Sequence, residues 1–322
     1  MPWTLKATIV TAVAFGAFTA SFDPAYGQTM PDPAQNQPDR AVGNQNSDAT
    51  PADIDLEGTL ELLTFTGPTT GRQMPYALYL PKGYHETDRR FPVMYFLHGA
   101  GTARRAELQD GYGLFQAVFY DRAIASGTIP PMIIAMPVTQ GVSLWADAKD
   151  GSTLAATQFI EEFVPYMDQT YRTVAERNGR IVEGFSMGGN GAVLFGAKHP
   201  ELFSAVISID GAVHEWVTLG DYQRADIAAE TFGGDEAYFQ RYSPDHLMVE
   251  NAELIREHGL DFIFVVGQLK SYNERLREVM ESEQISLRYT DTTFRHEMGK
   301  LRRHDRDAIF SLVNKYFATA GE

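Results

Sequence analysis

The sequence contains no cysteine. This absence excludes disulfide bonds, a thiol nucleophile, a lipid anchor on cysteine and a thiolate metal site. No pair of histidines with the spacing His-x-x-x-His offers a different set of metal ligands. We therefore expect a functional site that holds no metal ion.

Basic residues are scarce relative to acidic ones. The chain has 27 lysines and arginines against 42 aspartates and glutamates, and its net charge is −15. No run of lysine and arginine interrupts this acidity, and a negative surface repels polyanions. The composition thus predicts that nucleic acid is not a partner, and it agrees with solubility outside the cell.

Long apolar runs are also missing. The apolar stretch 7–20 follows a single positive charge at Lys6, and it is too short to span a bilayer comfortably. Small residues at Ala25 and Gly27 then precede Gln28. This pattern predicts a signal peptide over residues 1–27, and hence a secreted or periplasmic protein without a stable membrane anchor. An uncleaved anchor is the alternative.

Residues 28–55 lack any hydrophobic periodicity and are rich in proline, glutamine, asparagine and aspartate. Such a segment cannot bury enough apolar surface to fold alone, so we expect a flexible tether. The chain has no internal repeat. We therefore expect one folded domain over residues 56–322, a length that permits a single large core.

Strand-like and helix-like stretches alternate from residue 56 onward. This alternation predicts an α/β fold, in which helices cover both faces of a mostly parallel sheet and the first two strands form an antiparallel pair. We expect the α/β-hydrolase fold in particular, because one of the strands leads into a nucleophile motif. The stretch 211–247 has no clear place in the sheet, and we expect a small insertion over the site. The strands are expected at 57–66, 74–81, 91–97, 131–137, 180–185, 203–209, 261–266 and 285–289, and helices at 154–169, 248–258, 272–282 and 300–318.

One of these strands ends in a nucleophile motif. The sequence Gly-Phe-Ser-Met-Gly over residues 184–188 lies between an apolar strand and a helical segment. The tight strand-to-helix turn that exposes a catalytic serine requires small neighbours, and glycines supply them on both sides. Ser186 is therefore the predicted nucleophile.

A serine hydroxyl needs a base to remove its proton. In this fold the base follows the nucleophile in the chain and lies in the loop after the last strand. His296 occupies that position, whereas His304 falls inside the final predicted helix. His296 is therefore the predicted base.

Two backbone N–H groups are expected to form the oxyanion hole. One belongs to Met187, the residue after the nucleophile, and the other to the loop that follows an early strand. That loop contains His98, Gly99, Ala100 and Gly101, and we assign the second N–H to Ala100. We expect His98 to be structural and to pack under the loop.

Several segments together resemble the "putative esterase" or esterase D family. They are LYLPKGY (78–84), FPVMYFLHGAG (91–101), IPPMIIAMP (129–137), GFSMGGNGA (184–192) and KHPELFSAVIS (198–208). The family includes feruloyl and acetyl-xylan esterases, S-formylglutathione hydrolases and mycolyl transferases. The resemblance extends from about residue 60 to 318, and it implies acyl-ester chemistry without a cofactor.

The triad acid departs from the family pattern. The family places an aspartate soon after the strand here at 261–267, but none occurs near Lys270. Glu274 is the nearest carboxylate and is the expected acid, with Asp210, at the end of strand 203–209, as its rival. Asp291 or a Ser–His dyad are further alternatives.

The resemblance implies a secreted serine esterase that acts on a small ester or an acylated polysaccharide, such as feruloyl or acetyl esters of the plant cell wall. An acyl transferase of the mycolyl type and a non-catalytic carbohydrate-binding relative are the alternatives. Candidate substrate contacts are aromatic and acidic residues outside the triad: Tyr112, Trp145, Asp147, Asp150, Trp216 and Tyr222.

Overall fold

The computed structural model describes residues 55–103, 113–221 and 224–320. The expected signal peptide (1–27) and nearly all of the expected tether (28–55) lie outside these ranges. Within them, no helix is both long enough and apolar enough to cross a bilayer.

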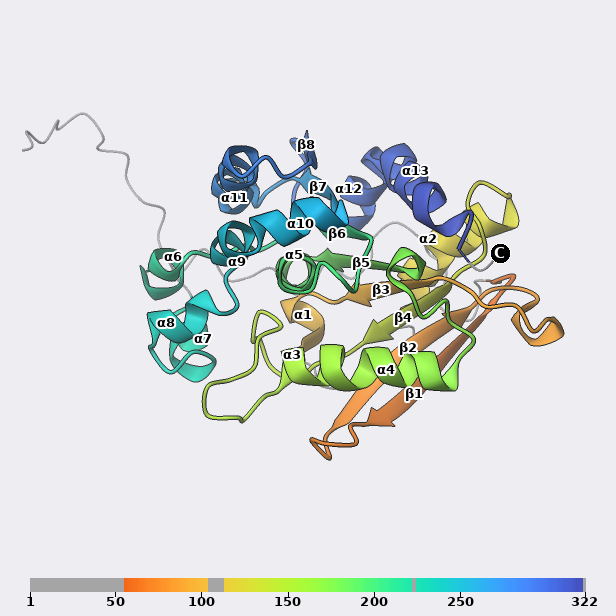
Figure 1. Ribbon diagram of the computed structural model, residues 1–322, viewed down its shortest axis with the longest axis horizontal. Coiled ribbons are helices and arrows are strands. Elements are labelled where there is room, and N and C mark those ends of the chain that lie inside the picture. Colours follow the sequence, from red (N-terminus) through yellow and green to blue (C-terminus); the bar gives the residue numbers. More distant parts are fainter. Residues whose placement is uncertain (1–54, 104–112, 222–223, 321–322) are drawn as a thin grey trace, which may run out of the picture. The chain divides into compact units, whose positions relative to one another are not determined.

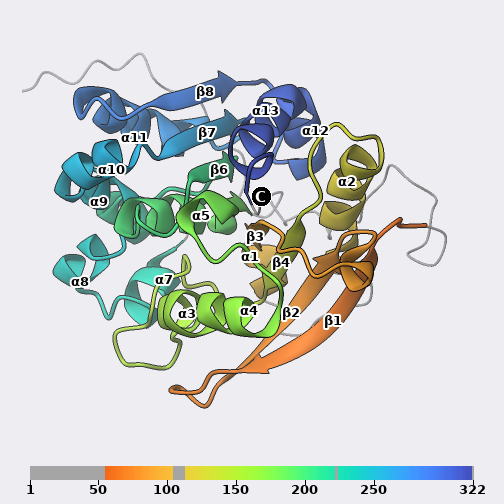
Figure 2. The same ribbon diagram turned by 45° about the vertical axis from the view of Figure 1, so that its right-hand side comes forward.

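A single sheet of eight strands organises the described residues, in the order β1-β2-β4-β3-β5-β6-β7-β8. The first three strands of this order pair antiparallel, and all later pairs are parallel. The hairpin of β1 and β2 forms one edge and β8 the other (Figure 2). The strands are β1 (Thr59–Thr66), β2 (Gln73–Leu80), β3 (Val93–Leu97), β4 (Ile133–Pro137), β5 (Arg180–Phe185), β6 (Ala205–Ile209), β7 (Asp261–Val266) and β8 (Leu287–Asp291).

Helices cover both faces of this sheet (Figure 1). One face packs against α3 (Ala155–Thr157), α4 (Val164–Thr170), α5 (Met187–Lys198), α9 (Pro244–Glu250), α10 (Ala252–His258) and α11 (Lys270–Ser282). The other packs against α2 (Leu114–Ala125), α12 (Met298–His304) and α13 (Arg306–Phe317). Shorter pieces are α1 (Ala100–Ala103), α6 (Trp216–Asp221), α7 (Ala225–Glu230), α8 (Glu236–Gln240), the 3₁₀ turns Tyr84–Glu86 and Arg177–Gly179, and a π-helical turn at Gln158–Phe163.

Hydrophobic patterning accounts for this arrangement. Strands β3 and β4 are buried at every position, as expected of central strands covered on both faces. Helix α11 instead buries Asn273, Leu276 and Met280, one side of an amphipathic helix, and exposes its charged side.

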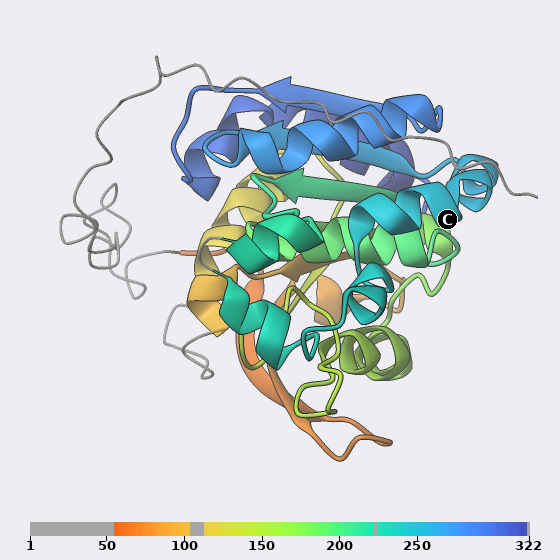
Figure 3. The same cartoon turned by 90° about the vertical axis from the view of Figure 1, so that its left-hand side faces the viewer.

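The chain enters the domain at a fixed point. The Asp121 carboxylate on α2 accepts hydrogen bonds from the backbone N–H groups of Glu57 (3.2 Å) and Gly58 (2.9 Å) and from the Tyr79 hydroxyl (2.8 Å). Strand β1 then starts at Thr59, opposite Leu80. The hairpin extends from the rest of the sheet in all views, most clearly in Figure 3.

The α/β-hydrolase prediction is confirmed, and every expected strand is present with small shifts at its ends. The helix expected at 248–258 is α9 and α10 with a break at Asn251, and the helix at 300–318 is α12 and α13 with a break at Asp305. Helix α2 was not expected. Where the structure describes them, residues 211–247 form the three short helices α6, α7 and α8 and the first turn of α9, and no strand.

Candidate active site

Ser186 lies at the turn between β5 and α5. Its backbone has φ 58° and ψ −120°, a conformation that side chains rarely adopt. The turn is this tight because the residues on either side of Ser186 include glycines without a Cβ. A Cβ on Gly184 would lie 2.0 Å from the Gly188 oxygen, and a Cβ on Gly188 would lie 1.9 Å from the Leu97 oxygen. The residues around Ser186 therefore have the geometry that the sequence motif predicted.

Backbone hydrogen bonds hold this strained residue in place. The Ser186 N–H donates to the Ile209 oxygen at 3.0 Å, and its carbonyl accepts from Asn190 (3.1 Å) and Ala212 (2.9 Å). Backbone strain of this kind costs about 1–3 kcal/mol and persists only where the surroundings impose it. The bond to Ala212 also ties the start of the 211–247 insertion to Ser186.

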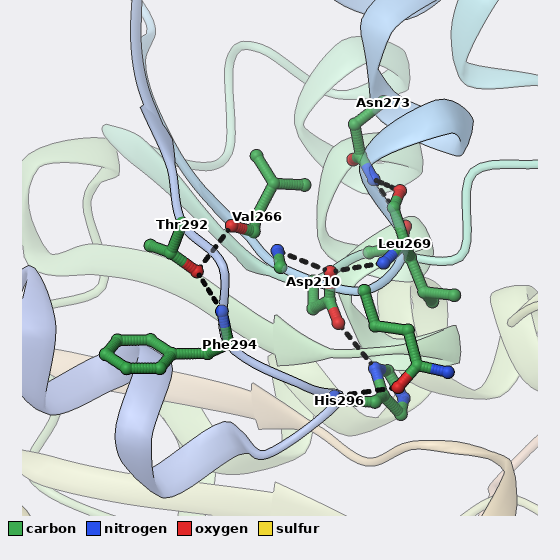
Figure 4. Close-up of polar contacts among 10 residues, drawn as sticks. Asp210, Val266, Leu269, Asn273, Thr292, Phe294 and His296 are labelled. Carbon is green, nitrogen blue, oxygen red and sulfur yellow. Dashed lines mark hydrogen bonds and ion pairs between the residues drawn. The ribbon is translucent and has the colours of Figure 1, made fainter.

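His296 contacts Asp210. Its Nδ1 lies 2.7 Å from Asp210 Oδ2, and Figure 4 shows the two side chains pointing toward each other. An ionised carboxylate can only accept a hydrogen bond, so Nδ1 carries the proton and Nε2 remains an acceptor. His296 is partly exposed and Asp210 is fully buried. The tautomer with the proton on Nδ1 and a free acceptor at Nε2 is the one that a general base requires.

The burial of Asp210 is compensated by hydrogen bonds. Its Oδ1 accepts from the backbone N–H groups of Gly267 (2.8 Å) and Leu269 (3.0 Å), both in the loop after β7 (Figure 4). With the bond to His296, the carboxylate has three donors, which offset the loss of its hydration. Asp210 directly follows β6 and itself has a positive φ of 44°.

The expectation that Glu274 contacts His296 is corrected by this geometry. Glu274 is about half exposed on α11, and its Oε1 lies 3.8 Å from Lys270 Nζ. Asp291 likewise pairs with Lys270. The loop after β7, where the family pattern places an acid, supplies two backbone donors to Asp210 instead. The structure thus places the rival residue, Asp210, in contact with the predicted base, His296.

The loop that carries His296 is fixed at several points. Thr292 donates its hydroxyl proton to the Val266 oxygen and accepts from the Phe294 N–H (Figure 4). The His296 N–H donates to Gln268 Oε1 at 3.2 Å. The imidazole stacks on Phe185, with ring centroids 4.4 Å apart. Since Phe185 precedes Ser186, this contact brings His296 next to the turn that holds Ser186.

Met187 and Ala100 both lie where free N–H groups are expected. Each is the first residue of a helix, α5 and α1 respectively, and the first N–H groups of a helix have no partner within it. A Cβ on Gly99 would lie 3.2 Å from the Ser186 Cβ, so the loop of Ala100 runs close to the serine. Their assignment to the oxyanion hole remains a prediction.

His98 is buried beneath this loop. Its Nε2 accepts from the Thr139 N–H at 3.0 Å, so its Nδ1 carries the proton and donates to the Gly99 oxygen at 2.9 Å. Burial lowers the pKa of His98 to about 4, so the ring is neutral at pH 7. With both ring nitrogens engaged, His98 has the packing position expected of it.

The described residues that were expected to contact the substrate instead make contacts within the protein. Trp145 is fully buried and donates its indole N–H to the His98 oxygen at 3.2 Å. Asp147 accepts from the N–H groups of Ala156 and Thr157 at the start of α3. Asp150 closes an exposed turn with Ser152, Trp216 packs on Phe239, and Tyr112 and Tyr222 lie outside the described residues.

No metal centre is visible in the part of the chain that the structure describes. There, no group of three or more histidine, aspartate or glutamate side chains has an arrangement that could hold an ion.

Known proteins are similar to this chain in sequence and in fold. The family described as "Putative esterase" matches residues 67–282. An endo-1,4-beta-xylanase/feruloyl esterase of Xylanibacter ruminicola is 32% identical over 157 residues, 45% of this chain and 20% of the relative. An esterase of Mycobacterium tuberculosis is 34% identical over 136 residues, 41% of this chain and 28% of the relative. The chain thus spans less than a third of the length of either protein.

Among solved structures, a ferulic acid esterase superposes with a TM-score of 0.65. The match covers 81% of this chain and 99% of that protein, at 20% sequence identity. Similarity at this identity establishes the common fold.

Proposed function

This chain belongs to the "Putative esterase" family, and from that premise we propose that it is a serine carboxylic ester hydrolase with Ser186, His296 and Asp210 as its triad. The observation that carries the proposal is the 2.7 Å contact between His296 Nδ1 and a buried Asp210, beside a serine with a strained backbone. A binding module has no use for such strain, which counts against a non-catalytic relative.

In the proposed reaction, Ser186 Oγ attacks the ester carbonyl while His296 Nε2 takes its proton. The N–H groups of Met187 and Ala100 stabilise the negative charge that develops on the carbonyl oxygen. His296 then returns the proton to the departing alcohol, which leaves an acyl-enzyme. Water, activated by the same histidine, releases the acid. Asp210 holds the imidazole orientation and stabilises the imidazolium.

The proposed substrates are feruloyl or acetyl esters of plant cell-wall polysaccharide. We propose that the enzyme is secreted or periplasmic, where it can reach them. The name of the Xylanibacter ruminicola relative joins xylanase and feruloyl esterase activities, and a ferulic acid esterase shares the fold. Export is proposed from the sequence of residues 1–27. These observations support the substrate class by analogy.

Turnover of p-nitrophenyl acetate, methyl ferulate and acetylated xylan by the wild type and by Ser186→Ala tests the proposal. We expect the wild type to release acid from at least one ester. The variant should lose nearly all turnover but keep its fold. A serine-directed organophosphonate should label Ser186 alone. Full activity of Ser186→Ala, or labelling of another serine, would overturn the assignment, and an acylated sugar in place of free acid would indicate a transferase.

A further inference from the structure

A buried ion pair lies between strand β5 and helix α12. Arg302 Nε is 3.4 Å from Glu183 Oε1, and neither side chain is exposed to solvent. Tyr120 on α2 donates its hydroxyl proton to Glu183 Oε2 at 2.8 Å. Burial, and then the charge of Glu183, raise the pKa of Tyr120 well above its usual value, so it remains a donor. Together, Glu183, Arg302 and Tyr120 therefore join β5, α12 and α2.

The guanidinium of Arg302 lies among aromatic rings. Its Cζ is 4.7 to 5.6 Å from the ring centroids of Phe96, Phe115, Phe119 and Tyr120. Stacking on aromatic faces suits a planar guanidinium and offsets part of its lost hydration. A buried pair of this kind nevertheless adds little net stability compared with apolar residues of similar volume. The pair calls for an explanation other than stability.

The position of the pair relative to the proposed triad supplies one. Glu183 and Phe185 point to the same face of β5, because side chains alternate along a strand. Phe185 stacks on His296, and Glu183 pairs with Arg302, which follows His296 by six residues. The strand that leads into Ser186 thus contacts the segment that carries His296 through two neighbouring side chains on one face, those of Glu183 and Phe185.

We propose that Glu183 and Arg302 are positioning residues that hold the base against the nucleophile. Helix α12 starts at Met298, two residues after His296, so a shift of this helix moves the histidine directly. A displacement of about 1 Å can reduce turnover by about 10²-fold. The inference rests on the proposed function, but the pair itself touches neither Ser186 nor His296.

The test compares the wild type with the double variant Glu183→Gln/Arg302→Met. Gln keeps the volume of Glu183 and an acceptor for Tyr120, while Met replaces the Arg302 stem with an unbranched apolar side chain, so no unpaired buried charge remains. We expect kcat on p-nitrophenyl acetate to fall at least about 10-fold while KM changes less than about twofold. The proton NMR resonance of the His296 Nδ1–H should broaden or disappear.

Strand β5 offers a matched control at its other end. Arg180, its first residue, forms a largely buried pair with Asp168, with Nη2 and Oδ2 2.5 Å apart. We expect the double variant Asp168→Asn/Arg180→Met to keep the kcat and the His296 resonance of the wild type, even where its melting temperature falls. An equal loss of kcat in this control would show that any damage to β5 suffices, and would overturn the proposal.

Arg302→Lys covers the case in which the first double variant does not fold. Lysine keeps the charge but not the planar group that stacks on the rings. We expect a partial loss of kcat and a weakened His296 resonance. A folded Arg302→Lys or double variant with kcat within about twofold of wild type and an intact resonance refutes the positioning role. A wild type that hydrolyses no ester refutes the proposed function instead, and the resonance still reports on positioning.

Discussion

At the scale of single residues, two members of the proposed triad have unusual backbone conformations. Ser186 has φ 58° and Asp210 has φ 44°, and each directly follows a strand. Backbone hydrogen bonds to neighbouring strands hold both: Ser186 donates to Ile209, and Asp210 donates to Val265. The strain is thus balanced by the sheet itself, and the two side chains emerge at the carboxyl ends of adjacent strands.

The acid can be identified by a pair of substitutions. If Asp210 orients His296, Asp210→Asn should lower kcat by about 10²- to 10⁴-fold, because the amide neither enforces the imidazole tautomer nor stabilises its charged form. Glu274→Gln, on the exposed side of α11, should leave kcat unchanged. Steady-state kinetics with p-nitrophenyl acetate, and circular dichroism to verify folding, measure both. The opposite pattern would return the role to Glu274.

The sequence could predict where Ser186 and His296 lie, because their positions follow from the order of strands and one short motif. It could not choose Asp210 over Glu274, since the deciding groups are the backbone N–H groups of Gly267 and Leu269. Every residue except proline carries a backbone N–H group, so the residue types in this loop do not reveal which N–H groups will reach a carboxylate. The buried Glu183–Arg302 pair was missed for a similar reason: it depends on which face of β5 meets α12.

At the scale of elements, His98 joins the loops after two adjacent strands, β3 and β4. The strands themselves could be predicted from their apolar runs. Helix α2 could not, because its buried side includes the polar residues Gln116 and Asp121 and so lacks a clear apolar stripe. Loop-to-loop contacts such as the one between His98 and Thr139 likewise carry no periodic signal.

The burial of His98 predicts a pH-dependent stability. The pKa of His98 is about 4 in the folded chain, against an ordinary value of 6.5. Below about pH 6.5 the unfolded chain therefore binds a proton that the folded chain does not. The contribution of neutral His98 is complete above pH 6.5 and is lost progressively as the pH falls toward 4, by about 2 kcal/mol at pH 5.

Urea unfolding of the wild type and of His98→Gln at pH 7 and pH 5 measures this term. Glutamine can still accept from the Thr139 N–H but does not titrate. The wild type should lose about 2 kcal/mol more than the variant between the two pH values. His214, whose pKa burial also lowers to about 4, contributes equally in both proteins. Equal pH sensitivity would contradict the assignment to His98.

At the scale of the whole molecule, the residues before the described domain predict that the protein is exported. The apolar stretch 7–20 and the small residues before Gln28 predict cleavage near Gly27. Protein recovered outside the cytoplasm should therefore have an amino terminus near Gln28, as determined by N-terminal sequencing. An intact Met1 in a membrane fraction would show that the segment is an anchor.

The hydrogen bonds from Glu57 and Gly58 to Asp121 fix the point at which another module or a support can be attached ahead of the domain. Thr59 pairs with Leu80, and β2 runs antiparallel to β4 with Tyr79 opposite Ile134, so β1 starts at the amino ends of the parallel strands. The proposed triad lies at their carboxyl ends. A bead, a carbohydrate-binding module or a cell envelope joined ahead of Glu57 would therefore connect at the amino ends of the parallel strands. The opposite edge of the sheet, with the proposed triad, would then stay accessible even to the polymeric substrates proposed above.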